Sequence, residues 1–407
     1  MILSVIIVNY NVKYFLEQCL YSVEKALLQG VAEGTGGEPA AEIIVVDNNS
    51  SDGSLAYLQP RFPRVRFIAN EDNVGFGRAN NQALKVAGGK YILFLNPDTI
   101  LPEDYCKTCL SFIAAHPGSG ALGIRMVDGS GRFLKESRRG FPSSWVAFCK
   151  MTGLTALFPR SRVFAEYYLG YLFPWKDHPA PILSGACMWV SREILDKTGG
   201  FDEQFFMYAE DIDLSYRIQQ EGYVNFYLAG TTILHFKGES TRKDIRYIRL
   251  FYKAMSQFRR KYARSIRWPL LNILMDGAIF GRAGIAALAG WIKVRKEKRI
   301  QPGKDNVRDD GNGDPGSEVL RTRLIGDPDG TARLETFLAA DPQRKLVPEG
   351  WTADELIVCE GPAFSFKECI GVIEETGLQL SCKIHAAGSG SAAGSHSKEE
   401  RGQTIVL

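Results

Sequence analysis

Apolar segments of strand length alternate with amphipathic segments of helix length along the N-terminal part of the chain. Four apolar segments predict buried strands, at residues 3–9, 42–50, 65–70 and 90–99. The segments between them have the apolar period of helices, at residues 12–28, 54–60 and 77–88. Strands that alternate with helices predict crossover connections and a largely parallel sheet.

The pattern changes after this region. Residues 138–182 are rich in aromatic side chains without a regular period, and we expect an irregular segment that either lines the core under a long loop or forms a lid over a site. Strand and helix patterns resume at residues 182–206. Residues 301–318 are rich in Gly, Pro, Asn and Asp and predict a linker. Residues 319–407 predict a small α/β module with no obvious catalytic set.

Polar residues follow each of the four predicted strands. In a parallel sheet, ligands bind beyond the carboxyl ends of the strands. The segments expected at that edge are residues 9–11, 47–52, 70–73 and 96–99.

The length of 407 residues predicts more than one domain, one large and one small. With 45% hydrophobic residues the chain can bury a substantial core. The formal net charge of +3 is unevenly distributed, because residues 241–300 hold 16 Lys and Arg against 3 Asp and Glu. This basic stretch predicts an anionic partner, either a membrane surface or a polyanion.

Residues 268–292 are apolar and long enough to cross a bilayer, although Pro269, Asp276 and Arg282 interrupt them. Both flanks are basic, and a single span with cytoplasmic charge at both ends would violate the positive-inside tendency. We therefore expect residues 263–300 to be a membrane-associating segment, interfacial or re-entrant, at the cytoplasmic leaflet. A buried helix pair of a soluble domain has the same composition and would explain the segment as well.

The eight cysteines are scattered, and the first residues lack the features of a signal peptide. We expect a cytoplasmic protein with reduced thiols. Cys106 and Cys109 form a CxxC motif, predicted on one face of a helix, but no second Cys or His pair has a zinc-like spacing.

Three groups of carboxylates could carry chemistry. Asp47 could accept hydrogen bonds from a nucleobase or ribose, although an Asx turn or helix cap explains it equally well. Asp98 could bind a divalent cation that bridges two phosphates, although a Pro-Asp turn also explains it. The third group is Glu210, Asp211 and Asp213, in FMYAEDIDLSYR.

Acids at the start of a helix stabilise it through the helix dipole, so the third group has a structural explanation as well. Glu210 and Asp211 are consecutive and point about 100° apart around a helix, so they cannot share one task. Asp213 is expected to cap the helix or to pair with Arg217 at i and i+4.

Six motifs, in this order, resemble the family 2 glycosyltransferases with the GT-A fold, in particular their bacterial rhamnosyltransferase-like branch. They extend over residues 3–262 and read SVIIVNYN, VVDNNSSDGS, NVGFGRANNQAL, YILFLNPDT, GGFDEQFFMYAEDIDLSYRIQQEGY and ILHFKGES. The resemblance implies an α/β fold with a Rossmann-like, mixed and mostly parallel sheet. It also implies inverting transfer of a sugar from a nucleoside diphosphate sugar to an acceptor hydroxyl.

The resemblance assigns roles to individual residues. Asp211 is the implied catalytic base, and Glu210 positions the acceptor. His235 and Asp98 are the implied ligands of Mg²⁺ or Mn²⁺, and Asn96 stands where the commoner Asp-x-Asp motif has its first Asp. The implied donor-binding residues are Val8, Asn9, Tyr10 and Asp47 around the nucleoside, and Asn73, Arg78 and Asn80 beside the diphosphate.

The function we predict is a cytoplasmic, membrane-associated glycosyltransferase that extends a lipid-linked glycan or polysaccharide precursor. Its donor would be dTDP-rhamnose or a UDP-sugar, and no nucleic acid would be a partner. The alternative enzymatic function is a nucleotidyltransferase. Such an enzyme would need a Gly-rich basic loop after the first strand, which VNYNVKYF does not provide. Two rival hypotheses without catalysis are an idle nucleotide-binding scaffold and a nucleic-acid-binding protein that uses residues 242–267.

Overall fold

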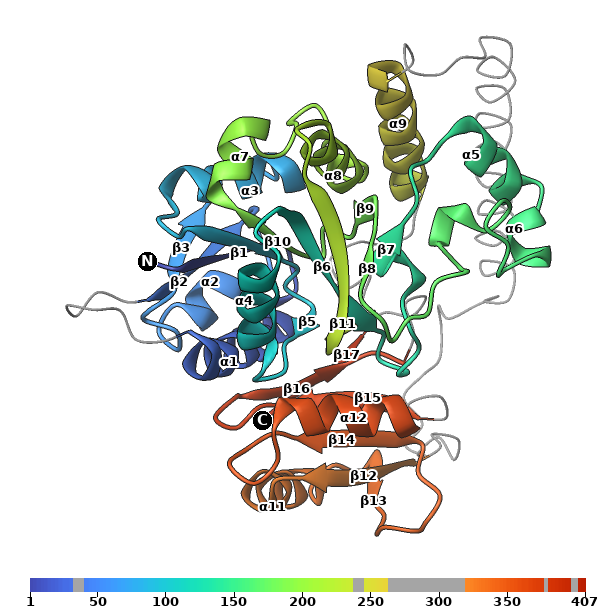
Figure 1. The fold of residues 1–407 in the computed structure, drawn as a ribbon. Coiled ribbons are helices and arrows are strands. Elements are labelled where there is room, and N and C mark those ends of the chain that lie inside the picture. Colours follow the sequence, from blue (N-terminus) through green and yellow to red (C-terminus); the bar gives the residue numbers. More distant parts are fainter. Residues whose placement is uncertain (32–39, 237–244, 263–318, 377–379, 397–401) are drawn as a thin grey trace, which may run out of the picture.

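A computed structural model describes residues 1–31, 40–236, 245–262, 319–376, 380–396 and 402–407 (Figure 1). The predictions for residues 268–292 and for the linker at 301–318 lie outside these ranges. Among the helices that are described, none is both long enough and apolar enough to cross a membrane.

A mixed sheet of nine strands forms the centre of the larger domain (Figure 1). Eight strands follow the order β3-β2-β1-β4-β10-β6-β11-β5, and β8 pairs with β11. The pairs among β1, β2, β3 and β4 are parallel, β10 is antiparallel to β4 and β6, and β6 is parallel to β11. The bounds are β1 Leu3–Asn9, β2 Ala41–Asp47, β3 Arg66–Ala69, β4 Tyr91–Leu95, β5 Thr99–Ile100, β6 Ser119–Val127, β8 His178–Pro179, β10 Cys187–Ser191 and β11 Val224–His235. The predicted mixed, mostly parallel α/β sheet is confirmed.

Helices cover both faces of this sheet. One face carries α1, α2 and α4, and the other carries α3, α7 and α8 (Figure 1). In β1, Val5 and Ile7 belong to the first core and Ile6 and Val8 to the second, because successive side chains of a strand point to opposite faces. The bounds are α1 Lys13–Gly30, α2 Ser54–Leu58, α3 Phe76–Val86, α4 Tyr105–Ala115, α7 Arg192–Thr198 and α8 Glu210–Gln220.

Residues 138–182 are more regular than predicted. They contain the helices α5 (Ser144–Met151) and α6 (Leu154–Leu157), besides a short two-stranded sheet. That sheet pairs β7 (Arg138–Arg139) with β9 (Ile182–Leu183). The expectation of an irregular segment was wrong here because helices of one or two turns are too short to show an apolar period. The remaining elements near it are the 3₁₀ helices η1 (Lys135–Ser137) and η2 (Glu166–Tyr168).

The predicted C-terminal α/β module is present. Its sheet has the order β13-β12-β14-β15-β16-β17, parallel up to β15 and antiparallel beyond it. The bounds are β12 Leu320–Gly326, α11 Pro328–Leu338, β13 Arg344–Leu346, β14 Glu355–Cys359, α12 Phe366–Thr376, β15 Ser381–His385, β16 Ser391–Gly394 and β17 Gln403–Val406. Figure 1 shows the module beside α1, with β16 nearest to that helix.

The module shares a hydrophobic core with the larger domain. Phe15 and Phe236 from the domain belong to the same buried cluster as Phe366 and Ile384 from the module. The Glu103 carboxylate accepts hydrogen bonds from the first backbone amides of α12, at 2.7 Å from Phe366 N. A carboxylate at a helix N-terminus is favoured by the helix dipole. The two parts are therefore packed as one unit.

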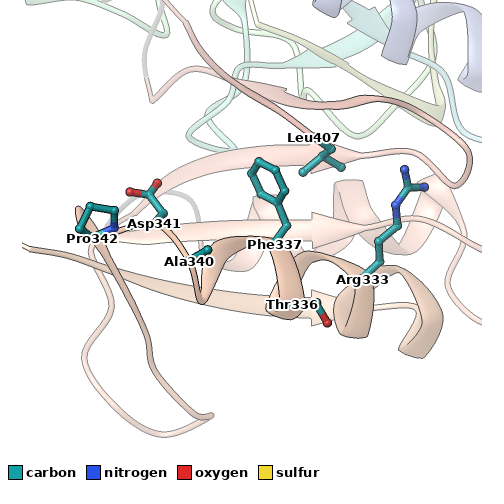
Figure 2. Close-up of a pocket in the computed structure, with 7 residues that line it drawn as sticks. All are labelled: Arg333, Thr336, Phe337, Ala340, Asp341, Pro342 and Leu407. Atoms are coloured by element: carbon teal, nitrogen blue, oxygen red, sulfur yellow. The ribbon is translucent and has the colours of Figure 1, made fainter.

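A shallow pocket of about 850 Å³ lies in the module (Figure 2). It contains none of the residues predicted for the site. Figure 2 shows that its lining comes from α11, the turn after that helix and the end of the chain, with Arg333, Thr336, Phe337, Ala340, Asp341, Pro342 and Leu407.

All eight cysteines are free and buried. Cys106 and Cys109 both lie on the buried side of α4, as the pattern predicted. Burial, together with the nearby Cys187, raises the pKa of Cys106 to about 12. Because the thiolate is the reactive form, these buried thiols are chemically inert.

Candidate active site

Two buried polar side chains end the adjacent strands β1 and β2. Asn9 and Asp47 are partners in the sheet register, and Asn9 Nδ2 donates to Asp47 Oδ1 over 2.6 Å. The Ser50 amide donates to Asp47 Oδ2 over 2.9 Å, which is the turn-forming contact that would also explain this aspartate. Val8 and Tyr10 flank Asn9 at this edge. A nucleoside pocket formed by these residues stays a prediction.

The residues predicted beside the diphosphate follow β3. Asn73 Oδ1 accepts a hydrogen bond from Gly75 N over 3.0 Å, in the loop before α3. Asn80 is buried on α3, whereas Arg78 is exposed and pairs with Glu203 over 3.1 Å. Their contact with a diphosphate stays a prediction.

Asn48 connects these two loops, although it was assigned no role within the motif VVDNNSSDGS that contains it. Its Nδ2 donates to the Gly75 carbonyl over 3.4 Å, and its Oδ1 accepts from Asn70 Nδ2 over 2.9 Å. Asn48 is buried. Its position directly after Asp47, at the end of a strand, was the signal that could have identified it.

The fold brings Asn96, Asp98 and His235 together. His235 is the last residue of β11 and lies opposite Thr99 of β5. Its Nε2 is 3.3 Å from Asp98 Oδ1 and 3.4 Å from Asn96 Nδ2. Asp98 and His235 are only 3% and 5% exposed, so they form a polar group shielded from bulk water.

This group fits a divalent cation that also binds phosphate. Asp98 supplies a carboxylate and His235 an imidazole, and His235 Nδ1 is buried without a hydrogen-bond partner among the described residues. Within the described ranges, no group of three or more His, Cys, Asp or Glu side chains is arranged to bind a metal ion by itself. Mg²⁺ is commonly held by one or two carboxylates together with substrate phosphates, so a diphosphate would complete the coordination.

The C-terminal module supports the segment that follows His235. The Phe236 amide donates to the Asp98 carbonyl over 3.0 Å. The Ser395 hydroxyl of the module donates to the Phe236 carbonyl over 3.1 Å. The Phe236 ring lies in the core shared with the module. The module therefore helps to hold the backbone next to Asp98 and His235.

Asp211 lies in the first turn of α8 and has three donors. Arg139 Nη2 donates to Asp211 Oδ2 over 2.5 Å, and the Gly185 amide donates to the same oxygen over 3.1 Å. The Ile212 amide donates to Oδ1 over 2.8 Å. The side chain of Asp211 is 14% exposed. These contacts hold an ionised carboxylate in one orientation.

Glu210 differs from its neighbour. It is 7% exposed, and its Oε2 has no hydrogen-bond partner among the described residues. Burial, together with the negative charge of Asp211, raises the pKa of Glu210 to about 8. The backbone before Glu210 is strained, because Tyr208 and Ala209 have φ of 69° and 67°. Such strain is typical of functional sites.

Asp213 has a structural role. Its carboxylate pairs with Arg217 over 2.7 Å, as the i and i+4 spacing predicted. Lys261 and Tyr262 of α9 (Ile245–Tyr262) contact the other oxygen, each over 2.6 Å. The end of this basic helix is thus tied to α8.

Two consecutive residues connect the Asp211 side of the site with the Asp98 side. The Gly185 amide donates to Asp211, and the Ala186 carbonyl accepts from the Asn96 amide over 2.8 Å. A Cβ on Gly185 would lie 3.1 Å from the Cβ of Asp211, so glycine permits the close approach of α8. The acidic helix start and the Asn96–Asp98 loop are therefore neighbours.

Arg139 is a site residue that sequence reasoning missed. Burial alone would lower the pKa of Arg139, but the Asp211 carboxylate outweighs that effect and raises it. The positive charges of Arg139 and Lys150 outweigh burial and lower the pKa of Tyr167. The Lys150 ammonium lies 3.6 Å from the Tyr167 ring centroid. The tandem arginines at 138 and 139 were the only signal in the sequence.

Replacing Arg139 by Met is expected to lower kcat about 10- to 100-fold, because Asp211 loses the contact that orients it. KM should change little. Arg139→Lys retains a cation and should recover part of kcat, and circular dichroism would check the fold of both variants. Equal kcat for Arg139→Met and the wild type would show that the other donors suffice to position Asp211.

The sheet order and the polar edge agree with the glycosyltransferase fold that the motifs implied. Residues 4–199 match the model of the family described as Glycosyl transferase family 2. N-acetylglucosaminyl-diphospho-decaprenol L-rhamnosyltransferase of Mycobacterium tuberculosis is 30% identical over 256 residues, which are 60% of this chain and 78% of that protein. The chain belongs to glycosyl transferase family 2 and is a glycosyltransferase.

Two further comparisons are with proteins that are also named as sugar transferases. Rhamnosyltransferase WbbL of Escherichia coli K12 is 25% identical over 208 residues, or 49% of this chain and 74% of that protein. The mannosyltransferase PcManGT of Pyrobaculum calidifontis, solved with GDP-Man and Mn²⁺, is 18% identical. Its TM-score is 0.43 over 74% of this chain and 76% of that one. Family membership decides against the nucleotidyltransferase.

Proposed function

We propose that the protein transfers a hexosyl group from a nucleoside diphosphate sugar to a hydroxyl of a lipid-linked glycan, with inversion at the anomeric carbon. One observation carries this proposal. The oriented carboxylate of Asp211 and the polar group around Asp98 are neighbours across Gly185 and Ala186. A single displacement needs a base on one side of the anomeric carbon and charge neutralisation on the other.

Asp211 would act on the acceptor. As the acceptor oxygen forms its bond to the anomeric carbon, its proton passes to an Asp211 carboxylate oxygen. Arg139 and the Gly185 amide hold that carboxylate in place. Glu210, with its pKa raised to about 8 by burial and by Asp211, is mostly protonated at neutral pH and can donate a hydrogen bond to the acceptor sugar. The two neighbouring acids thus have different tasks.

The opposite side receives the leaving group. The bond between the anomeric carbon and the diphosphate oxygen breaks, and its electron pair stays with the nucleoside diphosphate. Asp98 and His235 would hold Mg²⁺ or Mn²⁺, which neutralises charge on a diphosphate when bound. Asn9 and Asp47, at the edge of the same sheet, would bind the nucleoside.

The relatives suggest the substrates. One is named for L-rhamnose transfer to N-acetylglucosaminyl-diphospho-decaprenol, and another is a rhamnosyltransferase. We therefore propose dTDP-rhamnose as the first donor to test, with UDP-sugars as the next, and a polyprenyl diphosphate-linked sugar as the acceptor.

Incubation of the protein with each donor, Mg²⁺ and a polyprenyl diphosphate-linked N-acetylglucosamine tests this function. We expect one donor to add a single sugar mass to the acceptor and to release an equal amount of nucleoside diphosphate. If nucleotide binds but no donor gives a glycosylated product with this or other lipid-linked acceptors, the proposal fails. The idle nucleotide-binding scaffold would then be the better explanation.

A further inference from the structure

One segment of the larger domain exposes an unusual amount of apolar surface. We call residues 144–165 the apolar lobe, which comprises α5, α6 and the turn that follows. Figure 1 shows α5 and α6 outside the two helical layers, beyond β7 and β9. Of the fifteen large apolar side chains that are exposed in the described part of the chain, the lobe holds five, namely Trp145, Phe148, Leu157, Phe158 and Val163.

These side chains are held in place. The rings of Trp145 and Phe148 are stacked with centroids 5.7 Å apart, and Phe164 lies 6.1 Å from Trp145 and 5.3 Å from Phe158. The Trp145 indole nitrogen donates to the Val163 carbonyl over 3.0 Å. Leu157, adjacent to Phe158, is 70% exposed. A structured apolar surface of this kind marks an interaction site.

The charge of the lobe selects its partner. Lys150, Arg160 and Arg162 are exposed, and residues 144–165 contain no Asp or Glu. Aromatic and aliphatic side chains beside Lys and Arg are the composition that binds the interface of an anionic bilayer. The negative surface potential of such a bilayer attracts exposed cations, while the apolar side chains enter the headgroup region.

The lobe is also connected to the catalytic carboxylate. It begins a few residues after β7, which carries Arg139. Lys150 of the lobe contacts the Tyr167 ring, and the Tyr167 carbonyl accepts a hydrogen bond over 3.1 Å from the amide of Gly140, the residue after Arg139. Arg139 in turn contacts Asp211. We propose that the apolar lobe docks on an anionic membrane surface and thereby places Asp211 near the headgroups. A sugar on a lipid diphosphate is confined to that layer, so an acceptor of the proposed kind would be reached there.

The docking itself stands on the surface of the lobe, and its benefit for transfer rests on the function proposed above. Two measurements separate the two ideas. The first is vesicle binding, which needs no sugar donor. The second is transfer to a short-chain acceptor that is soluble in water, which needs no membrane.

The location of docking can be tested with a fluorophore on Leu157→Cys, because the eight native cysteines are buried. With vesicles of phosphatidylcholine containing about a third phosphatidylglycerol, its emission should shift to shorter wavelength, as expected in the interface. The same fluorophore on Trp351→Cys, a residue of the module that is 63% exposed, should not shift. If the emission of the label at residue 157 does not shift, the proposal is overturned. If the emission shifts without vesicles as the protein concentration rises, the lobe instead binds a second copy of the chain.

The contribution of the lobe can be tested with Trp145→Gln/Leu157→Gln/Phe158→Gln. We expect its partition coefficient on the same vesicles to fall about ten-fold or more. Leu28→Gln, which removes an apolar side chain that is 77% exposed on α1, is the matched control and should bind as the wild type does. The triple variant should retain transfer to the water-soluble acceptor. Unchanged partitioning of the triple variant overturns the proposal.

The charged part has its own test. Arg160→Gln/Arg162→Gln should bind the anionic vesicles roughly ten-fold less, and added salt should weaken wild-type binding in the same direction. Equal binding of wild type and this variant to anionic vesicles would contradict the proposed electrostatic contribution.

Discussion

Replacing Asp211 by Asn is expected to lower kcat roughly 10²- to 10⁴-fold, the usual loss when a general base is removed. The KM for the nucleotide sugar should change little. An amide has the size of the carboxylate and still accepts a hydrogen bond from the Gly185 amide, but it cannot take up the proton of the acceptor hydroxyl. Initial rates of nucleoside diphosphate release, measured with saturating acceptor, give kcat.

Two variants make this result specific. Glu210→Gln resembles the protonated acid that the raised pKa of about 8 implies, so it should lose far less activity than Asp211→Asn at neutral pH. Asp196→Asn removes an exposed carboxylate of α7 and should be neutral. If Asp211→Asn is folded and transfers sugar at the wild-type rate, the assignment fails. If Glu210→Gln shows the larger loss, the base is Glu210.

Replacing Asp98 by Asn is expected to lower kcat/KM roughly 10²- to 10³-fold, because the charge of the leaving diphosphate is no longer neutralised in a shielded site. The Mn²⁺ concentration needed for half-maximal rate should rise. His235→Gln should have a smaller effect in the same direction. EDTA should abolish turnover of the wild type, and Mg²⁺ or Mn²⁺ should restore it.

Metal binding can be measured without turnover. Electron paramagnetic resonance of Mn²⁺ with nucleoside diphosphate should show tight binding to the wild type and weak binding to Asp98→Asn. Asp329→Asn, an exposed carboxylate of the module, serves as the control and should match the wild type. Full activity in the presence of EDTA would contradict the metal role of Asp98.

The regular elements of both domains could be predicted from periodicity. Residues 5–8 and 91–95 are continuous apolar runs because both faces of these strands are covered by helices. The amphipathic pattern of residues 12–28 identified α1, because its apolar side chains, such as Leu16 and Leu20, pack into the core on one face of the sheet. Short elements such as α6 were not predicted, because their formation depends on turns and caps more than on an apolar face.

The edge proposed to bind the donor could be predicted from the sequence, and the part proposed to bind the acceptor could be predicted only in part. Asn9 and Asp47 end parallel strands and Asn96 directly follows one, and the topology of a parallel sheet places such ends on one edge. Arg139 lies on a two-residue strand, far in sequence from Asp211. No periodicity connects these two residues, so their contact could be seen only in three dimensions.

The packing of the C-terminal module also could not be predicted from the sequence. The apolar face of α12 indicates that this helix is buried, but it does not say against which partner. In the structure Phe366 and Ile370 pack into a core that includes Phe15 and Phe236 of the larger domain. The C-terminal module, for which no sequence motif predicted a role, therefore contacts the strand that carries His235.

The sequence by itself determined the α/β class, the family motifs and the acids from which a base and a metal ligand could be chosen. Local patterns suffice for these because strand and helix periods depend on near neighbours. Only the tertiary structure decided that Arg139 orients Asp211, that Gly185 and Ala186 join the two halves of the site, and that the apolar lobe stays exposed. These are contacts, or missing contacts, between segments distant in sequence, and they depend on how the elements pack.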